Sequence, residues 1–118
     1  MLNLNHKKLT VWTKALSLIK ESYRLTQKLP KDELYGLSSQ IRRASVSIAS
    51  NIAEGASRRS QLEHKRLYEI SRSSLVEVDT QIEICLLLEF LENSDLTELE
   101  PLVNEVFALL TTMIKITK

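Results

Sequence analysis

The stretch QIRRASVSIASNIAEGASRRSQLEHKRLYEIS, from Gln40 to Ser71, decides the fold of this 118-residue chain. Apolar residues recur at intervals of three and four in its first part, which predicts an amphipathic helix. We expect Gly55 to cap that helix at its C-terminus. The S-x-x-E sequence from Ser60 to Glu63 fits a capping box and predicts that a second helix starts there. The predicted core stripe of the first of these two helices is Leu37, Ile41, Ala44, Ile48 and Ile52.

The composition favours a few long helices in one domain. The chain has only two glycines and two prolines, and a β-rich protein would need more of both for its turns. No apolar run approaches the roughly 20 residues of a membrane span, and the N-terminus lacks the apolar stretch of a signal peptide. We therefore expect a single domain over residues 1–118 in a bacterial-type cytoplasm.

Helix-breaking residues and capping signals in the sequence predict four helices. The first is expected over about 8–28, because the residue before Pro30 is disfavoured in a helix. We expect the second over about 32–55, the third over about 60–91 and the fourth from about 95. Pro101 should kink the fourth helix or move its true start to about Glu100. Short connections then predict an all-α, antiparallel up-down-up-down four-helix bundle. The predicted core stripe of the first helix is Trp12, Leu16, Ile19 and Tyr23.

Charge is divided unevenly along the chain. Residues 1–72 hold fourteen Lys and Arg against six Asp and Glu, whereas residues 73–118 hold two against nine, giving balances of +8 and −7. Such segregation indicates either nucleic acid on the basic part or head-to-tail pairing of subunits. The alternative is that the two halves fold against each other and neutralise.

The expected helices carry more apolar residues than one core stripe needs. A lone bundle should present polar outer faces, and exposed second rows would leave large apolar patches. We therefore expect an oligomer, although the grooves of the bundle itself could absorb these rows. Arg42 lies beside the second row of the second helix and could pair with an acidic residue of a neighbouring subunit. The candidate interface residues are Val11, Leu18, Leu25, Arg42, Val46, Ala49 and Ala53.

Basic residues form two rows around the predicted start of the third helix. Arg58, Lys65 and Arg72 are spaced by seven and share a face if that helix extends back through Arg58, and Arg59 and Arg66 form a parallel row. Rows of this kind can follow phosphates without reading bases. A solvated face, partly neutralised by neighbouring glutamates, is the alternative. The candidate nucleic-acid-binding residues are Arg43, Arg58, Arg59, Lys65, Arg66 and Arg72.

The sequence lacks a catalytic or metal-binding constellation. His6 and His64 are far apart and have no other ligands at metal-binding spacing, so we expect no metal and no other cofactor. Cys85 is the only cysteine and lies in an apolar run, which predicts an inert buried thiol. The serines have no general base beside them. We therefore expect no enzymatic activity.

The segment LYGLSSQIRRASVSIASNIAEGASR, from Leu34 to Arg58, resembles the signature of a known bacterial family. This is the four-helix-bundle family encoded by intervening sequences of 23S rRNA genes, also labelled an S23 ribosomal protein family. The match is specific in Gln40–Arg43 and Ser50–Gly55. The segments LTVWTKALSLIKESYRLTQKLP and SLVEVDTQIEICLLLEFL resemble its first and third helices. Ser45 and Ala49 differ from the usual alanine and proline without threatening the fold.

The resemblance implies an antiparallel bundle that assembles into a homopentameric ring. A more distant similarity is to the accessory protein of diversity-generating retroelements, a basic pentameric barrel that works with a reverse transcriptase and RNA. Together with the basic rows, these resemblances favour a non-enzymatic, ring-forming scaffold associated with RNA or DNA. The alternative is a structural or adaptor homo-oligomer that binds another protein and has no direct nucleic-acid role.

Overall fold

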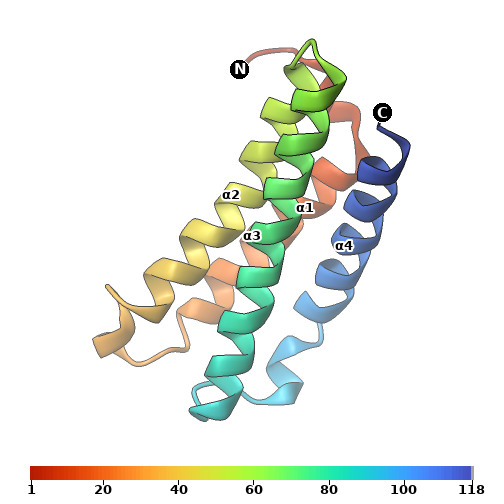
Figure 1. Cartoon of the computed structure of the whole chain (residues 1–118). Coiled ribbons are helices and arrows are strands. Elements are labelled where there is room, and N and C mark those ends of the chain that lie inside the picture. The colour runs from red at the N-terminus through yellow and green to blue at the C-terminus, as the bar shows by residue number, and fades with distance from the viewer. Residues whose placement is uncertain (118) are drawn as a thin grey trace.

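Four α-helices form the protein, and the computed structural model describes residues 1–117 (Figure 1). Successive helices run in opposite directions, which confirms the predicted all-α, up-down-up-down bundle. Three short 3-10 turns, η1, η2 and η3, lie at Asn5–Lys8, Lys31–Glu33 and Asn93–Leu96. The helices are α1 (Thr10–Thr26), α2 (Leu37–Ser57), α3 (Gln61–Leu87) and α4 (Leu99–Ile116).

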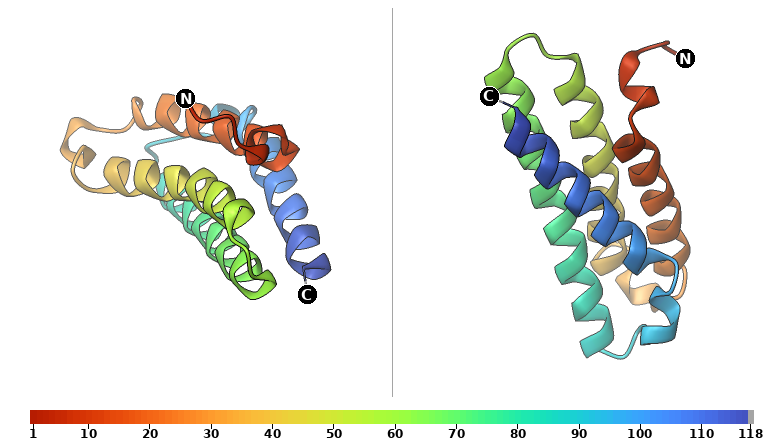
Figure 2. Two further views of the ribbon diagram at one scale, coloured as in Figure 1. Left: turned by 90° about the horizontal axis from the view of Figure 1, so that it is seen from above. Right: turned by 90° about the vertical axis from the view of Figure 1, so that its right-hand side faces the viewer.

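The four helices surround one core, and each packs against two neighbours. Both α1 and α3 lie beside α2 and α4, and the contact between α2 and α3 is the most extensive. The last helix, α4, crosses obliquely, from the α1 side at its start toward the α3 side at its end (Figure 2). The bundle is elongated, with extents of 43 × 28 × 20 Å along its principal axes.

Small residues allow α2 and α3 to pack closely. The Ser71 hydroxyl is buried and donates to the carbonyl of Ile48 at 2.8 Å. The hydroxyls of Ser47 and Ser74 lie 2.9 Å apart, within hydrogen-bond distance. At the far end of this seam, the Tyr68 ring packs onto Gly55, where an added Cβ would lie 2.8 Å from Cε1 of the ring. Gly55 is thus a residue of close helix approach.

The prediction that Gly55 caps α2 was therefore wrong. Helix α2 continues to Ser57, and no glycine of the described chain has a positive φ. A glycine inside a helix normally weakens it by roughly 0.5–1 kcal/mol relative to alanine. Here the missing Cβ is what lets the Tyr68 ring reach the α2 backbone.

The start of α2 also differs from the expected one. The segment around Asp32 forms η2, and α2 begins only at Leu37. Gly36 adopts a non-helical conformation, with φ −114° and ψ −111°, which separates the two elements. The Glu33 carboxylate accepts a hydrogen bond from the Leu37 N–H at 3.1 Å, so this acidic residue still serves the helix N-terminus.

Two other helix starts agree with the sequence prediction. The Ser60 hydroxyl accepts from the Glu63 N–H at 3.0 Å, as expected for an N-cap of α3. Helix α4 begins at Leu99, and Pro101 therefore lies in its first turn. A proline is tolerated there because the first backbone N–H groups of a helix have no intrahelical acceptor.

Helix α3 ends at Leu87, four residues before the predicted end at Leu91. Glu89 has a φ of 62°, in the left-handed region that L-residues other than Asn and Asp rarely adopt. The Phe90 N–H donates to the Cys85 carbonyl at 2.9 Å, and the Glu89 N–H donates to the Leu86 carbonyl at 3.1 Å. This pair of bonds is a Schellman motif, with Glu89 in the place that glycine usually occupies.

The predicted core stripe of α1 was wrong. Leu16 and Tyr23 are 42% and 39% exposed, and Trp12 and Ile19 are only partly buried. Helix α1 has a second apolar row beside the predicted stripe. This second row includes Ala15 and Ser22, whose small side chains allow the neighbouring helices to pack closer to α1. The row that faces the core is Val11, Ala15, Leu18, Ser22 and Leu25. Three predicted interface residues, Val11, Leu18 and Leu25, are therefore core residues, because they are at most 3% exposed.

Replacement of Gly55 by alanine tests the α2–α3 seam. We expect Gly55→Ala to lower the free energy of unfolding by about 1–3 kcal/mol, because the new methyl overlaps the buried Tyr68 ring. Urea denaturation measures this change. Ser50→Ala, on the exposed side of α2, is the control and should stay within about 0.5 kcal/mol of wild type. A stabilised Gly55→Ala variant, as at an ordinary helical glycine, would contradict the seam.

Glycine at position 89 should have the opposite effect. Glu89→Gly is expected to raise the free energy of unfolding by about 0.5–1 kcal/mol, because glycine adopts a positive φ without steric cost. The matched control is Glu77→Gly, an exposed position inside α3, which should lower it by about 1 kcal/mol. Equal destabilisation by both substitutions in thermal unfolding would show that the left-handed conformation at Glu89 costs nothing.

Candidate nucleic-acid interface

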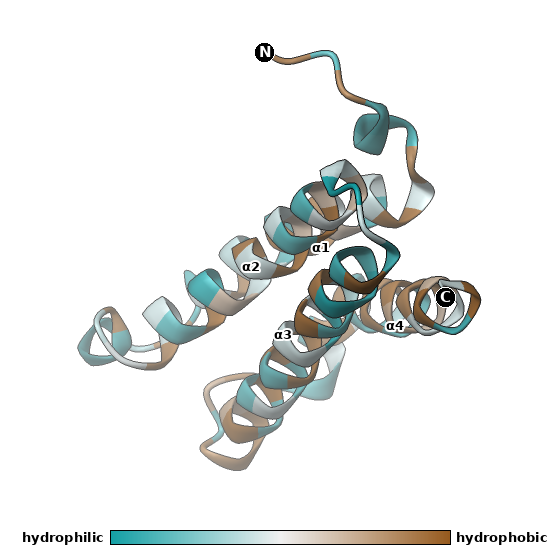
Figure 3. Cartoon of the chain, turned by 45° about the horizontal axis from the view of Figure 1, so that its top comes forward, coloured by the Kyte–Doolittle hydropathy of each residue, from teal (hydrophilic) through white to brown (hydrophobic). Residues whose placement is uncertain are grey.

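Basic residues gather at one end of the bundle, around the connection between α2 and α3. These two helices form a helical hairpin, and this end is here called the hairpin end. Both chain termini lie at this end as well (Figure 1). In Figure 3, hydrophilic residues mark the start of this connection and η1. Because η1 packs against α1 and α2, it brings Lys7 and Lys8 to the same end. Sequence reasoning missed these two lysines, since only the tertiary structure places them there.

Arg58 does not continue the row of α3. It follows the last residue of α2 with extended backbone, so the predicted shared helical face with Lys65 and Arg72 was wrong. Its guanidinium lies 2.5 Å from the Glu54 carboxylate, one turn earlier on α2. Both side chains are about half exposed, and this ion pair removes part of the positive charge of Arg58.

Arg72 points toward α4. Its guanidinium donates to the Thr111 hydroxyl at 3.3 Å and lies 5.9 Å from the centre of the Phe107 ring. A cation placed over a ring in this way is attracted by its π-face. Arg72 therefore belongs to the contact between α3 and α4, away from the hairpin end.

Arg59, Lys65 and Arg66 are the candidates best placed for a ligand. Among residues 1–117, none of them forms an ion pair with a carboxylate. Arg59 lies in the connection and is exposed, and Arg66 is exposed on α3. Arg43 lies on α2. It precedes Arg58 by fifteen residues, which corresponds to about 22 Å along a helix. It lines a hollow with Glu77 and Gln81, so it stands apart from this group.

The predicted interface residues of α2 have different environments. Ala49 is a core residue at 6% exposure, which makes that assignment wrong, whereas Val46 is 41% exposed and Ala53 is partly buried. Arg42 is fixed against α1: its Nε donates to the Thr26 hydroxyl at 2.9 Å, and its guanidinium lies 4.8 Å from the centre of the Tyr23 ring.

The acidic half of the chain is neutralised only in part by the basic half. Lys14 pairs with Glu105 at 3.4 Å, and Lys28 pairs with Asp95 at 2.7 Å. The hydrogen bond from Lys28, joined by one from the Glu92 N–H, holds the pKa of the Asp95 carboxyl below its usual range. Lys14 lies on α1 and Lys28 in the turn that follows it, so both ion pairs join the acidic half to the first helix or its C-terminal turn.

Within residues 1–117, no group of three or more His, Cys, Asp or Glu side chains is arranged to hold a metal ion. Cys85 is fully buried, and burial raises the pKa of its thiol to about 11, with a smaller contribution from Glu33. Burial likewise raises the pKa of the Tyr68 phenol. Neither group is ionised at neutral pH, so neither is an activated nucleophile.

The fold thus defines the class of protein, which is an all-helical bundle with basic residues at its hairpin end. The sequence profile of the 23S rRNA-intervening sequence protein family matches residues 7–112, and the chain belongs to this family. No match was found among curated proteins. No helix within residues 1–117 is both long and apolar enough to cross a membrane.

A solved structure has the same fold. It is the crystal structure of a protein of unknown function from the S23 ribosomal protein family of Bacteroides thetaiotaomicron. The two superpose with a TM-score of 0.82 at 22% sequence identity, over 90% of this chain and 99% of the other. At this level of identity, the similarity establishes the four-helix bundle.

The state of Cys85 can be tested with a thiol reagent. We expect the native protein to react with Ellman's reagent at pH 8 far more slowly than the urea-unfolded chain, because the thiol is buried and its pKa is raised to about 11. Absorbance at 412 nm follows the reaction. Equal rates for native and unfolded protein would place Cys85 at the surface.

Proposed function

We propose that this protein is a non-enzymatic scaffold that binds RNA or DNA through the hairpin end of α2 and α3. One observation carries the proposal: Arg59 in the connection between these helices, and Lys65 and Arg66 near the start of α3, have no carboxylate partner among the described residues. Lys7 and Lys8 add charge at the same end of the bundle. A site of this kind attracts phosphates electrostatically, releasing their counterions.

The chemistry of this end favours contacts with phosphates over contacts with bases. Tyr68 is the one tyrosine, phenylalanine or tryptophan of α3, but it is 6% exposed and packed against α2, so it offers no stacking surface. Base stacking is what strengthens binding of single strands. We therefore expect weak, poorly sequence-specific binding of structured RNA or duplex DNA, governed by charge.

Self-association would strengthen such weak contacts. We propose a cytoplasmic homo-oligomeric ring, a homopentamer, as the resemblance to the 23S rRNA-intervening sequence proteins implies. Each subunit contributes one basic hairpin, so several weak contacts act on one nucleic acid and raise its overall affinity. The exposed apolar side chains on α1 and α2, including Leu16, Tyr23 and Val46, support association between copies.

A protein-binding adaptor is the second candidate. It is supported by Leu87 and Leu88, which are 79% and 51% exposed at the end of α3. This end lies opposite the basic hairpin (Figure 1). A partner bound there would leave the basic end unused, and its affinity would depend little on salt.

Binding should depend on Arg59 and Arg66. We expect affinity for a structured RNA to fall steeply between roughly 50 and 200 mM salt. The variant Arg59→Ala/Arg66→Ala should bind more weakly, and the slope of log affinity against log salt should decrease by about one for each lost phosphate contact. Both side chains are exposed, so the variant should keep its fold. Fluorescence anisotropy at several salt concentrations measures both quantities.

The control is Lys20→Ala/Lys31→Ala, which removes two exposed charges away from the hairpin. It changes the net charge equally and should leave the salt slope close to that of wild type. Identical losses in the two variants would mean that overall charge, not the hairpin, attracts the nucleic acid. No binding by wild type at low salt would instead favour the adaptor.

A further inference from the structure

Two surfaces on different sides of the bundle combine exposed apolar side chains with charges of opposite sign. The first, here called the aromatic–basic surface, lies on α1, the connection after it and α2. The second, here called the acidic groove, lies between α3 and α4. The aromatic–basic surface consists of Tyr23, Leu34, Tyr35, Arg42, Arg43 and Val46. The acidic groove is lined by Val76, Asp79, Glu83, Leu86, Glu100 and Phe107.

The aromatic–basic surface combines exposed apolar groups with positive charge. Tyr35 is 93% exposed and Leu34 is 49% exposed, and they border an open hollow of about 660 Å³. Arg42 is held rigid by Thr26 and by the ring of Tyr23. Because this arginine is already ordered, a partner that contacts it loses little additional side-chain entropy.

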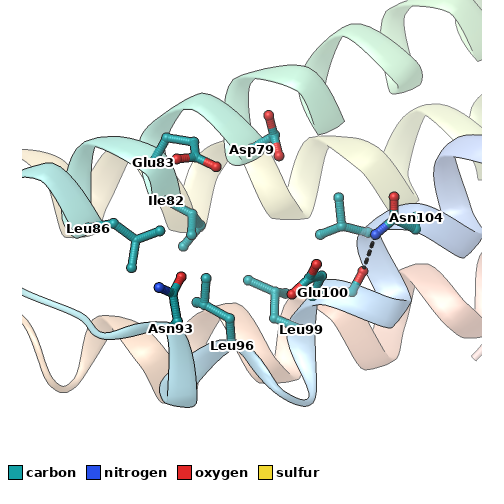
Figure 4. A pocket seen from close by; sticks show the side chains of 10 residues that line it. Asp79, Ile82, Glu83, Leu86, Asn93, Leu96, Leu99, Glu100 and Asn104 are labelled. Carbon is teal, nitrogen blue, oxygen red and sulfur yellow. Dashed lines mark hydrogen bonds between the residues drawn. The ribbon is translucent and has the colours of Figure 1, made fainter.

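The acidic groove has the complementary properties. It consists of two adjoining hollows of about 290 and 300 Å³ that share Asp79, Val103 and Asn104. Figure 4 shows carboxylates on both of its walls, with Asp79 and Glu83 on α3 and Glu100 on α4.

None of these three carboxylates forms an ion pair among residues 1–117. The apolar side chains Val76 and Phe107 are 49% and 43% exposed. Arg72 contacts the Phe107 ring at one end of the groove.

We propose that the acidic groove receives the aromatic–basic surface of a second copy of this chain. Apolar groups then cover each other, which removes two exposed patches from water. Arg42 and Arg43 meet the carboxylates of Asp79, Glu83 and Glu100, so the potentials of the two surfaces are complementary. This inference rests on the self-association in the proposed function and identifies the two surfaces that make it.

The charges also determine the geometry of the contact. In a two-fold dimer, a surface that meets its own copy is opposed by like charge. Reciprocal pairing of the two different surfaces would need both of them in one patch, and they lie on different sides of the bundle. The contact is therefore heterologous, with one surface of each copy meeting the other surface of the next.

Helices α1 and α2 are neighbours, as are α3 and α4, so the two surfaces belong to opposite helix pairs. One subunit can therefore bind two neighbours at once. Such a chain of subunits closes into a ring if the rotation per step permits it.

Two variants, each with one of the two surfaces disabled, test the proposed contact directly. Arg43→Glu/Val46→Glu disables the aromatic–basic surface, and Val76→Lys/Asp79→Lys disables the acidic groove. All four side chains are exposed, and circular dichroism checks that each variant is folded. Light scattering after gel filtration, without nucleic acid, should give a monomer for each variant alone. The equimolar mixture should associate into a 1:1 heterodimer or a larger mixed oligomer, because each variant retains one working surface and the two altered surfaces carry opposite charges.

Other outcomes of this experiment would overturn the proposal. They are a mixture that stays monomeric, a variant that keeps the wild-type mass and a wild type that is monomeric at micromolar concentration. The controls Lys20→Glu and Glu98→Lys reverse charges on the groove between α1 and α4 and should keep the wild-type mass. Because mass is measured without nucleic acid, failure here is distinct from failure of RNA binding, which the Arg59 and Arg66 variant reports.

Discussion

The close packing of α2 against α3 is the constraint on which the rest of the structure depends. Two helices approach closely only where their contact lacks bulky side chains, and here Gly55, Ser47, Ser71 and Ser74 meet this requirement. The buried hydroxyl of Ser71 is satisfied by the Ile48 carbonyl, so burying it costs little. Tyr68 fills the space above Gly55 and fixes the hairpin that carries the basic residues.

Much of this architecture could be predicted from local sequence signals. The four helices, the Ser60 cap and the position of Pro101 near the start of α4 follow from caps, breakers and periodicity. The orientation of α1 does not, because both of its rows are apolar. The choice of the row with Ala15 and Ser22 depends on how closely neighbouring helices pack, and sequence periodicity carries no such information.

The candidate site could be predicted only in part. Lys65 and Arg66 lie near the start of α3, but Arg58 and Arg59 precede that helix, so neither predicted row of basic residues is one helical face. Arg58 pairs with Glu54, and Arg72 contacts Phe107. The partners of both arginines depend on local backbone geometry or on another helix, and the spacing of basic residues cannot reveal them. The same holds for Lys7 and Lys8, which tertiary packing brings to the hairpin end.

The charge segregation along the chain becomes a segregation in space. Ion pairs from Lys14 and Lys28 offset part of the acidic half, and the carboxylates of the groove between α3 and α4 are left without ion-pair partners in the described chain. The basic charge divides between the hairpin end and the aromatic–basic surface. We therefore propose that the hairpin end binds nucleic acid and that the two lateral surfaces mediate self-association.

Hydrogen–deuterium exchange of the wild-type protein, with and without a structured RNA at about 50 mM salt, tests this division most directly, because phosphate contacts persist at low salt. The hairpin around residues 57–67 should become protected when RNA is added, while residues 76–107 of the acidic groove should exchange at an unchanged rate. Protection of the acidic groove, or of neither region despite binding, would contradict the account.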